Sequence, residues 1–363
     1  MANALSADRF TAVATEGLGR KSAGTAGSMV HFRGGVYVGT TCAGPVGRSD
    51  APRILRYDIN SGTWGSVYET PLIDPPPRLR GDDHGSRPDG PSRLQRDRRR
   101  RKGEDDLVDD PAGKVPRDSG YQSMCVFQGK SDRSPALYVS TMSRTGAILL
   151  RSEDGEAFEP VSSPGFGDTR VYSFRSLVES NGWLFVVPAG TVTDANLDRN
   201  LPPEPKIYVS NDPRKGTWLE AATPGFGDPS NLAIYPVCPA FGRIYAGTAN
   251  ADLGCQVWRS EAQGEPPFDW SPVIVDGGGA FNKNFAVGAM AEFKNALYVG
   301  VGVTGFGFET THQVGPASGE LWRVHPDGRW DLIAGQMRVS ADGLKVPLSL
   351  LGPGLDDFYN SMI

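Results

Sequence analysis

The sequence predicts an all-β protein of the β-propeller class, built from repeated four-stranded units. Its 363 residues include 46 glycines and 29 prolines, a high usage that indicates many tight turns and short strands. One hairpin pattern occurs five times, and a second hairpin follows each copy. Two hairpins repeated about every 50 residues are typical of propeller blades, whereas a β-sandwich of unrelated hairpins does not repeat such a unit.

The first hairpin of each unit has an apolar strand, a turn with Gly or Asn, and a strand of the form (Leu/Val/Ile)-(Tyr/Phe)-(Val/Ala). Two β-rich runs around a short turn predict a β-hairpin. The five copies begin at Met29, Met124, Leu177, Val237 and Met290. We expect these hairpins to supply the two inner strands, A and B, of each blade.

The second hairpin of each unit has a turn that combines Asp or Asn with Gly, and then an aromatic residue. Asp and Asn suit such turns because their side chains bond the local backbone. The five copies begin at Arg56, Arg151, Tyr208, Trp258 and Trp322. Their aromatic residues are Trp64, Phe158, Trp218, Trp270 and Trp330. We expect each aromatic ring to close strands C and D against the neighbouring strand.

Three of these turns share a motif of Asp, Gly and an aromatic residue. Its residues are Ser210, Asp212, Gly216, Thr217 and Trp218; Ser152, Asp154, Gly155 and Phe158; and Asp58, Gly62, Thr63 and Trp64. The motif resembles the Asp-box, the S-x-D-x-G-x-T-W turn of sialidase-like propellers. The first hairpins resemble a family of bacterial propellers of undescribed function with F-x-G-x-LYVGT strands. The resemblance implies structural turns on the outer rim and does not imply glycosidase activity.

The pentapeptide PGFGD occurs at Pro164–Asp168 and Pro224–Asp228, between strand D of one unit and strand A of the next. Divergent copies occupy the other joints, at Val115–Tyr121, Gly277–Asn284 and Pro353–Asp357. Because these joints share one face of a propeller, their polar side chains should gather near the mouth of the central channel. The side chains concerned are Asp168, Asp228, Asn282, Asn284 and Asp357. Either each Asp closes its own turn, or the set supplies oxygen ligands for Ca²⁺, another divalent cation or a polar substrate.

Residues 1–363 are expected to form a single propeller domain. A further copy of the joint, EGLG at Glu16–Gly19, follows a predicted strand D at residues 9–15. Residues 357–363 are predicted to form a strand A, but strands B and C of that unit are missing. The sequence therefore predicts a six-bladed propeller whose last blade is split between the two ends and truncated. The alternative is a five-bladed ring with trailing ends.

A charged insert, residues 75–114, separates the first and second units. It combines a basic run at Arg98–Lys102 with an acidic stretch at Glu104–Asp110 and has almost no apolar residues. That composition predicts a disordered surface loop. The alternatives are a lid over the channel mouth, a polyanion-binding arm, or an artefact of the reading frame.

Few residues predicted on the channel face carry chemistry. His312 lies near Glu309 in a long B-to-C loop, which suits a general base with its orienting carboxylate, although a solvated loop His is the simpler interpretation. Tyr172 and Arg175 begin a strand A, where Arg175 suits a carboxylate or phosphate ligand, or else a backbone carbonyl of the next blade. Polar ligand-binding candidates on the same face are Asn231, Asn250 and Asn360.

Net charge, apolar stretches and cysteine placement limit the partners and the location that the sequence predicts. The formal net charge of −5 argues against general nucleic-acid binding. No stretch approaches 18 apolar residues, so we expect no membrane span. The N-terminal residues do not read as a signal peptide, and the cysteines form no ligand cluster, which together predict a cytoplasmic protein with reduced thiols.

No known catalytic motif supports a particular activity. The chain has no G-x-S-x-G elbow, phosphate loop or H-E-x-x-H helix, and the residue set of a sialidase cannot be assembled. We therefore expect a non-catalytic propeller that binds a small ligand or a protein partner on its channel face. The alternative is a metal-assisted lyase or hydrolase that acts at the channel mouth, through the joint residues and His312.

Overall fold

The computed structural model describes residues 12–14, 18, 23–42, 51–74, 114–192, 200–303 and 318–350. Within these ranges the protein is all-β apart from single helical turns. No helix among the described residues is long and apolar enough to cross a membrane. The insert predicted at residues 75–114 lies outside them except for Lys114.

The described strands form four-stranded antiparallel sheets in which each strand pairs with the next along the chain. The first is β1 (Ala23–Phe32), β2 (Gly35–Cys42), β3 (Arg53–Asp58) and β4 (Thr63–Glu69). The second is β7 (Asp118–Phe127), β8 (Ala136–Ser143), β9 (Leu149–Ser152) and β10 (Glu159–Pro160). The third is β11 (Val171–Ser180), β12 (Trp183–Thr191), β13 (Tyr208–Ser210) and β14 (Leu219–Glu220).

Two further sheets repeat the same topology. The fourth is β15 (Asn231–Ala240), β16 (Arg243–Asn250), β17 (Val257–Ser260) and β18 (Ser271–Ile274). The fifth is β19 (Ala286–Phe293), β20 (Ala296–Gly302), β21 (Glu320–Val324) and β22 (Trp330–Ala334). All five hairpin pairs predicted from the sequence are therefore present as A–B–C–D meanders.

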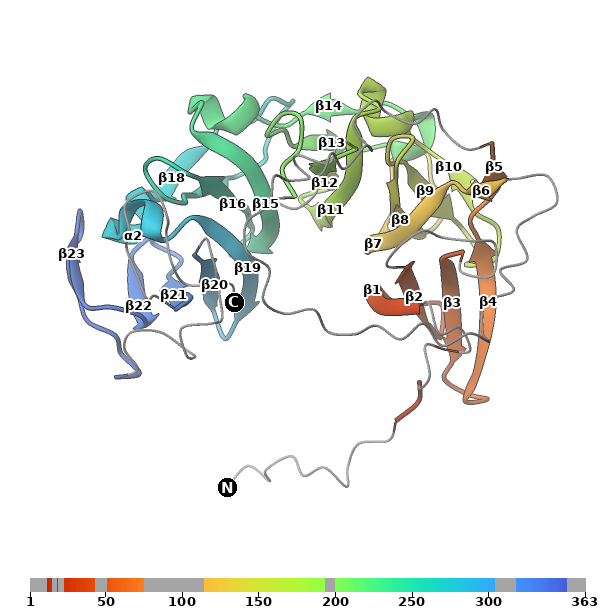
Figure 1. Cartoon of the computed structure of the whole chain (residues 1–363), viewed down its shortest axis with the longest axis horizontal. Helices are drawn as coiled ribbons and strands as arrows, with labels where there is room; N and C mark the ends of the chain where they lie inside the picture. Colours follow the sequence, from red (N-terminus) through yellow and green to blue (C-terminus); the bar gives the residue numbers. More distant parts are fainter. Residues whose placement is uncertain are drawn as a thin grey trace, which may run out of the picture.

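The five sheets lie side by side along an arc, with β1, β7, β11, β15 and β19 on its inner side (Figure 1). Single bridges such as Ser173↔Met142 and Ala249↔Ala286 join strand B of one sheet to strand A of the next. The sheets are therefore blades of a β-propeller. The total number of blades stays a prediction, since residues 357–363 are not described and only 12–14 of residues 9–15 are, outside any strand.

The hydrophobic core lies between neighbouring blades rather than in one central mass. Phe185 of the third blade, for example, packs in one cluster with Ile244 of the fourth, and Tyr245 of the fourth packs with Trp322 of the fifth. Strand β12 is buried along its whole length because blades cover both of its faces. Each blade thus depends on its neighbours for the burial that stabilises it.

Short elements flank these blades. The strands β5 (Leu72–Ile73) and β6 (Val115–Pro116), which flank the charged insert in the sequence, pair with each other. After the fifth blade, β23 (Arg338–Ser340) and β24 (Gly343–Lys345) form a separate hairpin that the sequence did not predict. Residues of this hairpin line a cavity on the outer rim.

The PGFG joints form single 3₁₀ turns, η4 (Pro164–Gly167) and η6 (Pro224–Gly227). Gly165 takes positive φ, and Phe166 does so as well, at φ 56°; Phe226 repeats this at φ 57°. A left-handed non-glycine residue costs about 1–2 kcal/mol. Phe166 offsets that cost by packing against aromatic rings of the third blade, with Trp218 at 5.0 Å between centroids.

Two rim tryptophans, those of the outer hairpins of the third and fourth blades, also bond the blade that precedes their own. The Nε1 of Trp218 donates to the carbonyl of Val161, and that of Trp270 to Ala221, both at 3.1 Å. Val161 and Ala221 each lie three residues before a PGFG turn. These hydrogen bonds therefore tie the outer hairpin of one blade to the end of strand D in the blade before it.

The first blade makes the same contacts with the N-terminal segment. Trp64 Nε1 donates to the carbonyl of Val13 at 2.6 Å, and Val13 lies three residues before EGLG. Leu18 has φ 55°, the value of Phe166 and Phe226, and its carbonyl accepts from Arg53 at 2.9 Å. Val13 and Leu18 therefore occupy the same place beside the first blade that the preceding joints occupy beside the third and fourth blades.

We expect Trp64→Phe, which removes the indole donor, to lower the free energy of unfolding by about 1 kcal/mol, the net value of a typical hydrogen bond. In a chain that lacks residues 1–18, the same substitution should have no effect, because its acceptor is gone. Urea unfolding of the four proteins measures this coupling. Equal losses from Trp64→Phe with and without the segment would contradict the assigned contact.

Candidate functional site

The inner strands carry a β-bulge at one shared position. The pairing of strands A and B shifts around Gln122 in β7, Arg175 in β11 and Tyr235 in β15. These residues lie four positions after the first residue of their strands. Bulges re-aim side chains and are frequent near binding sites. Three consecutive blades therefore have a large polar residue at the same bulge position of strand A.

Arg175 is the distinctive member of this set. Its guanidinium stacks over the ring of Tyr235, 4.7 Å from the centroid, and burial lowers its pKa from the ordinary arginine value. Within the described part of the chain its side chain makes no hydrogen bond or ion pair. The carbonyl contact considered from the sequence is thus replaced by stacking on Tyr235. The Oε1 of Gln122 is buried and also lacks a hydrogen-bond partner among those residues.

Tyr172, the other residue predicted on this strand, ties two blades together. Its hydroxyl lies 2.6 Å from Oγ of Ser119, on β7 of the preceding blade. Nearby, Ser176 Oγ donates to the carbonyl of Tyr235 at 2.9 Å. Hydroxyl groups therefore fix the blades on either side of Arg175.

The structure brings together two predicted ligand-binding residues, Asn231 and Asn250, and one predicted metal ligand, Asp228. Asn250 Nδ2 donates to Asn231 Oδ1 at 3.0 Å and to Asp228 Oδ2 at 3.2 Å. Asn231 Nδ2 donates to the carbonyl of Gly225 and to Oε1 of Gln256, both at 2.9 Å. Gln256, which the sequence did not single out, donates in turn to Asp228 at 2.9 Å. The side chains bond one another and fix the joint.

Asp168, predicted as a metal ligand, is likewise engaged by its own turn. Arg170 donates to it from Nε at 2.9 Å and from Nη2 at 2.7 Å, and these bonds hold the pKa of Asp168 below its usual value despite partial burial. Asp168 and Asp228 thus both accept hydrogen bonds from neighbouring side chains, and a metal-binding role for either stays a prediction.

A charged version of the joint network lies before the fifth blade. Asn284 Nδ2 donates to the carbonyl of Gly277 at 2.9 Å and to Glu320 Oε2 at 2.8 Å. Trp322 Nε1 also donates to Glu320, as Trp258 does to Gln256 in the fourth blade. Glu320 is fully buried and pairs with Arg338 of β23 at 2.7 Å. Because the fifth blade has Glu320 where the fourth has Gln256, its network includes an ion pair with Arg338, which lies outside the blade.

The remaining predicted residues add no ligand set within the described ranges. Asn282 lies in the turn η7 (Phe281–Lys283), next to this network. Among the residues that the structure describes, no three His, Cys, Asp or Glu side chains gather to hold a metal ion. Four predicted residues lie outside the described ranges, namely His312, Glu309, Asn360 and Asp357. A divalent cation at the joints stays a prediction.

We expect Arg338→Leu to lower the free energy of unfolding by about 3–5 kcal/mol, because it leaves the Glu320 carboxylate buried without its cation. Adding Glu320→Gln should restore most of that loss, since Gln256 fills the equivalent position in the fourth blade without an arginine. Chemical denaturation of the single and double variants measures both effects. A double variant as unstable as Arg338→Leu alone would contradict this account.

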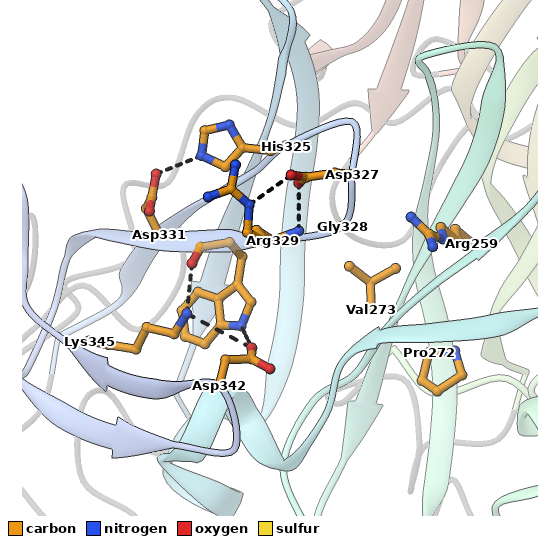
Figure 2. A pocket seen from close by; sticks show the side chains of 11 residues that line it. Arg259, Pro272, Val273, His325, Asp327, Gly328, Arg329, Asp331, Asp342 and Lys345 are labelled. Atoms are coloured by element: carbon orange, nitrogen blue, oxygen red, sulfur yellow. Dashed lines mark hydrogen bonds and ion pairs between the residues drawn. The ribbon is translucent and has the colours of Figure 1, made fainter.

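The outer rim holds a cavity of about 460 Å³ that the sequence did not predict. It lies between the C–D hairpin of the fourth blade and the hairpins β21–β22 and β23–β24 (Figure 2). Arg259 projects from one wall, and the turn that contains Gly328 forms the other. Above Trp330, Nζ of Lys345 lies 4.1 Å from the ring centroid. The cavity thus combines charged groups with an aromatic wall.

The acidic side chains of this cavity are already paired. Asp327 accepts from Arg329 Nε at 2.7 Å. Asp331 lies 2.7 Å from Nε2 of His325 and also accepts from Arg323 at 2.6 Å. Burial would raise the pKa of Asp331, but these hydrogen bonds more than offset it, so its pKa is lowered. Asp342 accepts from Trp330 Nε1 at 2.7 Å.

The lowered pKa of Asp331 predicts a pH-dependent contribution to stability. A carboxylate whose pKa is lower in the folded state stabilises the protein above the unfolded value, near 4, and loses that contribution as pH falls through the folded value. Asp331→Asn should therefore be less stable than the natural protein at pH 7, and the gap should narrow between pH 5 and pH 3. Urea unfolding at these pH values tests it, and an unchanged gap at pH 3 would contradict it.

Comparisons with known proteins give only distant matches. No protein-family model and no curated protein matches the chain. A GH74 xyloglucanase from Xanthomonas campestris aligns at 13% identity and TM-score 0.45, over 83% of this chain and 37% of its own. This chain therefore spans little more than a third of that enzyme.

Two other solved structures align over most of both chains. An α-L-arabinanase from Penicillium chrysogenum, complexed with arabinobiose, matches at 12% identity and TM-score 0.42, over 92% and 90% of the two chains. A protein of unknown function from Dyadobacter fermentans matches at 14% and 0.42, over 83% and 78%. At this distance none of the three decides function, which rests on the residues of this chain.

Proposed function

We propose that this propeller binds a small anionic ligand on its channel face and that Arg175 is the anchor. The observation that carries the proposal is the state of Arg175: a half-buried guanidinium on an inner strand, with no hydrogen bond or ion pair among the described residues. A desolvated charge without a counter-charge is costly. An anionic ligand would supply that counter-charge.

The groups around Arg175 suit recognition rather than acid–base chemistry. Gln122 and Tyr235 occupy the equivalent bulges on the strands either side, and burial raises the pKa of Tyr235. An amide and a neutral phenol exchange no proton near neutral pH. The buried Oε1 of Gln122 has no described partner and would accept from a donor group on the ligand. The role proposed is therefore binding.

The guanidinium fork selects the ligand class. Arg binds planar carboxylates and phosphates through two parallel hydrogen bonds, and such bonds are strongest where water is excluded. Stacking on Tyr235 holds the guanidinium plane in one orientation before the ligand arrives. A small carboxylate or phosphate compound is thus the expected ligand class.

Thermal unfolding in inorganic phosphate or in acetate, each against chloride at equal ionic strength, tests the proposal. At ten times the dissociation constant, a ligand adds about 1.4 kcal/mol, which corresponds to a rise in Tm of about 2 °C. We expect such a rise for at least one of the two anions, and its loss in Arg175→Met.

Arg170→Met is the matched control, because Arg170 lies directly before the same strand but is exposed and already paired with Asp168. This control should keep the full rise. The proposal is wrong if neither anion shifts Tm, or if Arg175→Met responds as strongly as the natural protein.

A further inference from the structure

Four blades place an arginine at one shared position of strand C. In each case the arginine lies opposite the tyrosine of strand B. The pairs are Arg56 with Tyr37, Arg151 with Tyr138, Arg259 with Tyr245, and Arg323 with Tyr298. Because the position is equivalent, differences in how these arginines are paired reflect the side chains around them.

Three of these arginines are paired with a carboxylate of their own blade. Arg56 pairs with Asp58 at 3.1 Å, Arg151 with Glu159 at 2.9 Å, and Arg323 with Asp331 at 2.6 Å. In two of them the carboxylate comes from the residue directly opposite on strand D, as the register Arg151↔Glu159 shows. In these two blades a cross-strand ion pair therefore joins strands C and D at the rim.

The fourth blade lacks this partner. The residue opposite Arg259 on strand D is Ser271, which is exposed. The acid two residues after Arg259, Glu261, is bonded to Arg243 at 2.5 Å instead. Among the described residues, the guanidinium of Arg259 has no carboxylate and no hydrogen-bond acceptor. It is half-buried, so water alone does not fully solvate it.

Arg259 is also the unmatched charge of the rim cavity. Each aspartate that lines the cavity is held by another side chain, as described above, and none bonds Arg259. Gly328 lets the opposite turn approach closely, because a Cβ there would lie 3.0 Å from Nη1 of Arg259. Pro272 and Val273 give the same wall an apolar surface beside the guanidinium (Figure 2).

We propose that this cavity is a second binding site, specific for a small organic carboxylate. The ligand carboxylate takes the place that Glu159 and Asp331 hold in the second and fifth blades and accepts two hydrogen bonds from the Arg259 fork. Its apolar part lies on Pro272 and Val273. The site is distinct from Arg175, which lies on an inner strand of another blade.

The test uses benzoate as the probe and benzamide, its neutral isostere, as the control ligand. Saturation-transfer NMR with the full chain should show benzoate bound with a dissociation constant at least about tenfold lower than that of benzamide, about the value of one charge-assisted hydrogen bond. Arg259→Gln should remove this preference. Arg170→Gln should keep it, because Arg170 lies outside the cavity and is paired with Asp168.

A second variant keeps the test valid if Arg259→Gln fails to fold. Ser271→Asp restores the cross-strand pair of the second and fifth blades and gives Arg259 an internal carboxylate, so it should displace benzoate while Ser271→Asn does not. All benzoate measurements are made in the Arg175→Met background, so that the carboxylate site proposed at Arg175 does not contribute to them. Equal binding of benzoate and benzamide, or undiminished benzoate binding by Ser271→Asp, would overturn the proposal.

Discussion

The fold depends on one aromatic side chain held in left-handed backbone at each PGFG joint. Phe166 and Phe226 accept that conformation because their rings pack against the blade that follows; Phe226 stacks on Trp258 at 4.8 Å. The joint therefore sets both where strand A begins and which rings it meets. Without these contacts, the strain of about 1–2 kcal/mol at each joint would favour a different turn.

The polar networks of the fourth and fifth blades follow from the same joint. Asn231 and Asn284 each bond a carbonyl of the preceding turn and a side chain at, or directly before, the first residue of strand C. Where that side chain is Gln256 the network is neutral, and where it is Glu320 the network recruits Arg338 and with it the β23–β24 hairpin. One change of residue type thus decides whether an extra element docks on the blade and forms a wall of the rim cavity.

The sequence predicted the blades because their signals are local. A turn with Gly between two β-rich runs specifies a hairpin wherever it occurs, and the Asp of the motif closes its own turn, as Asp154 does with the amides of Glu156 and Ala157. Arg175 was also singled out, since an arginine amid a predicted inner strand is conspicuous. Its stacking on Tyr235 was not, because the bulge that brings the two together depends on pairing between strands.

Arg259 was missed for a related reason. The role of Arg259 depends on the residue opposite it in the sheet. The loop between Arg259 and Ser271 is longer than the loop between Arg151 and Glu159, so counting along the chain does not identify the opposite residue. Gln256 was missed because its partner Asp228 comes from the preceding joint. In each case the missing information is a contact between segments far apart in the chain.

Three rim tryptophans donate to a carbonyl that lies earlier in the chain: Trp270 to Ala221, Trp218 to Val161, and Trp64 to Val13. This common direction has a consequence for synthesis. A blade that leaves the ribosome finds its acceptor already present on the preceding segment, so blades can dock one after another without waiting for the C-terminal part. Such blades can assemble in the order of translation, because each finished blade supplies the carbonyl acceptor to which the next one bonds.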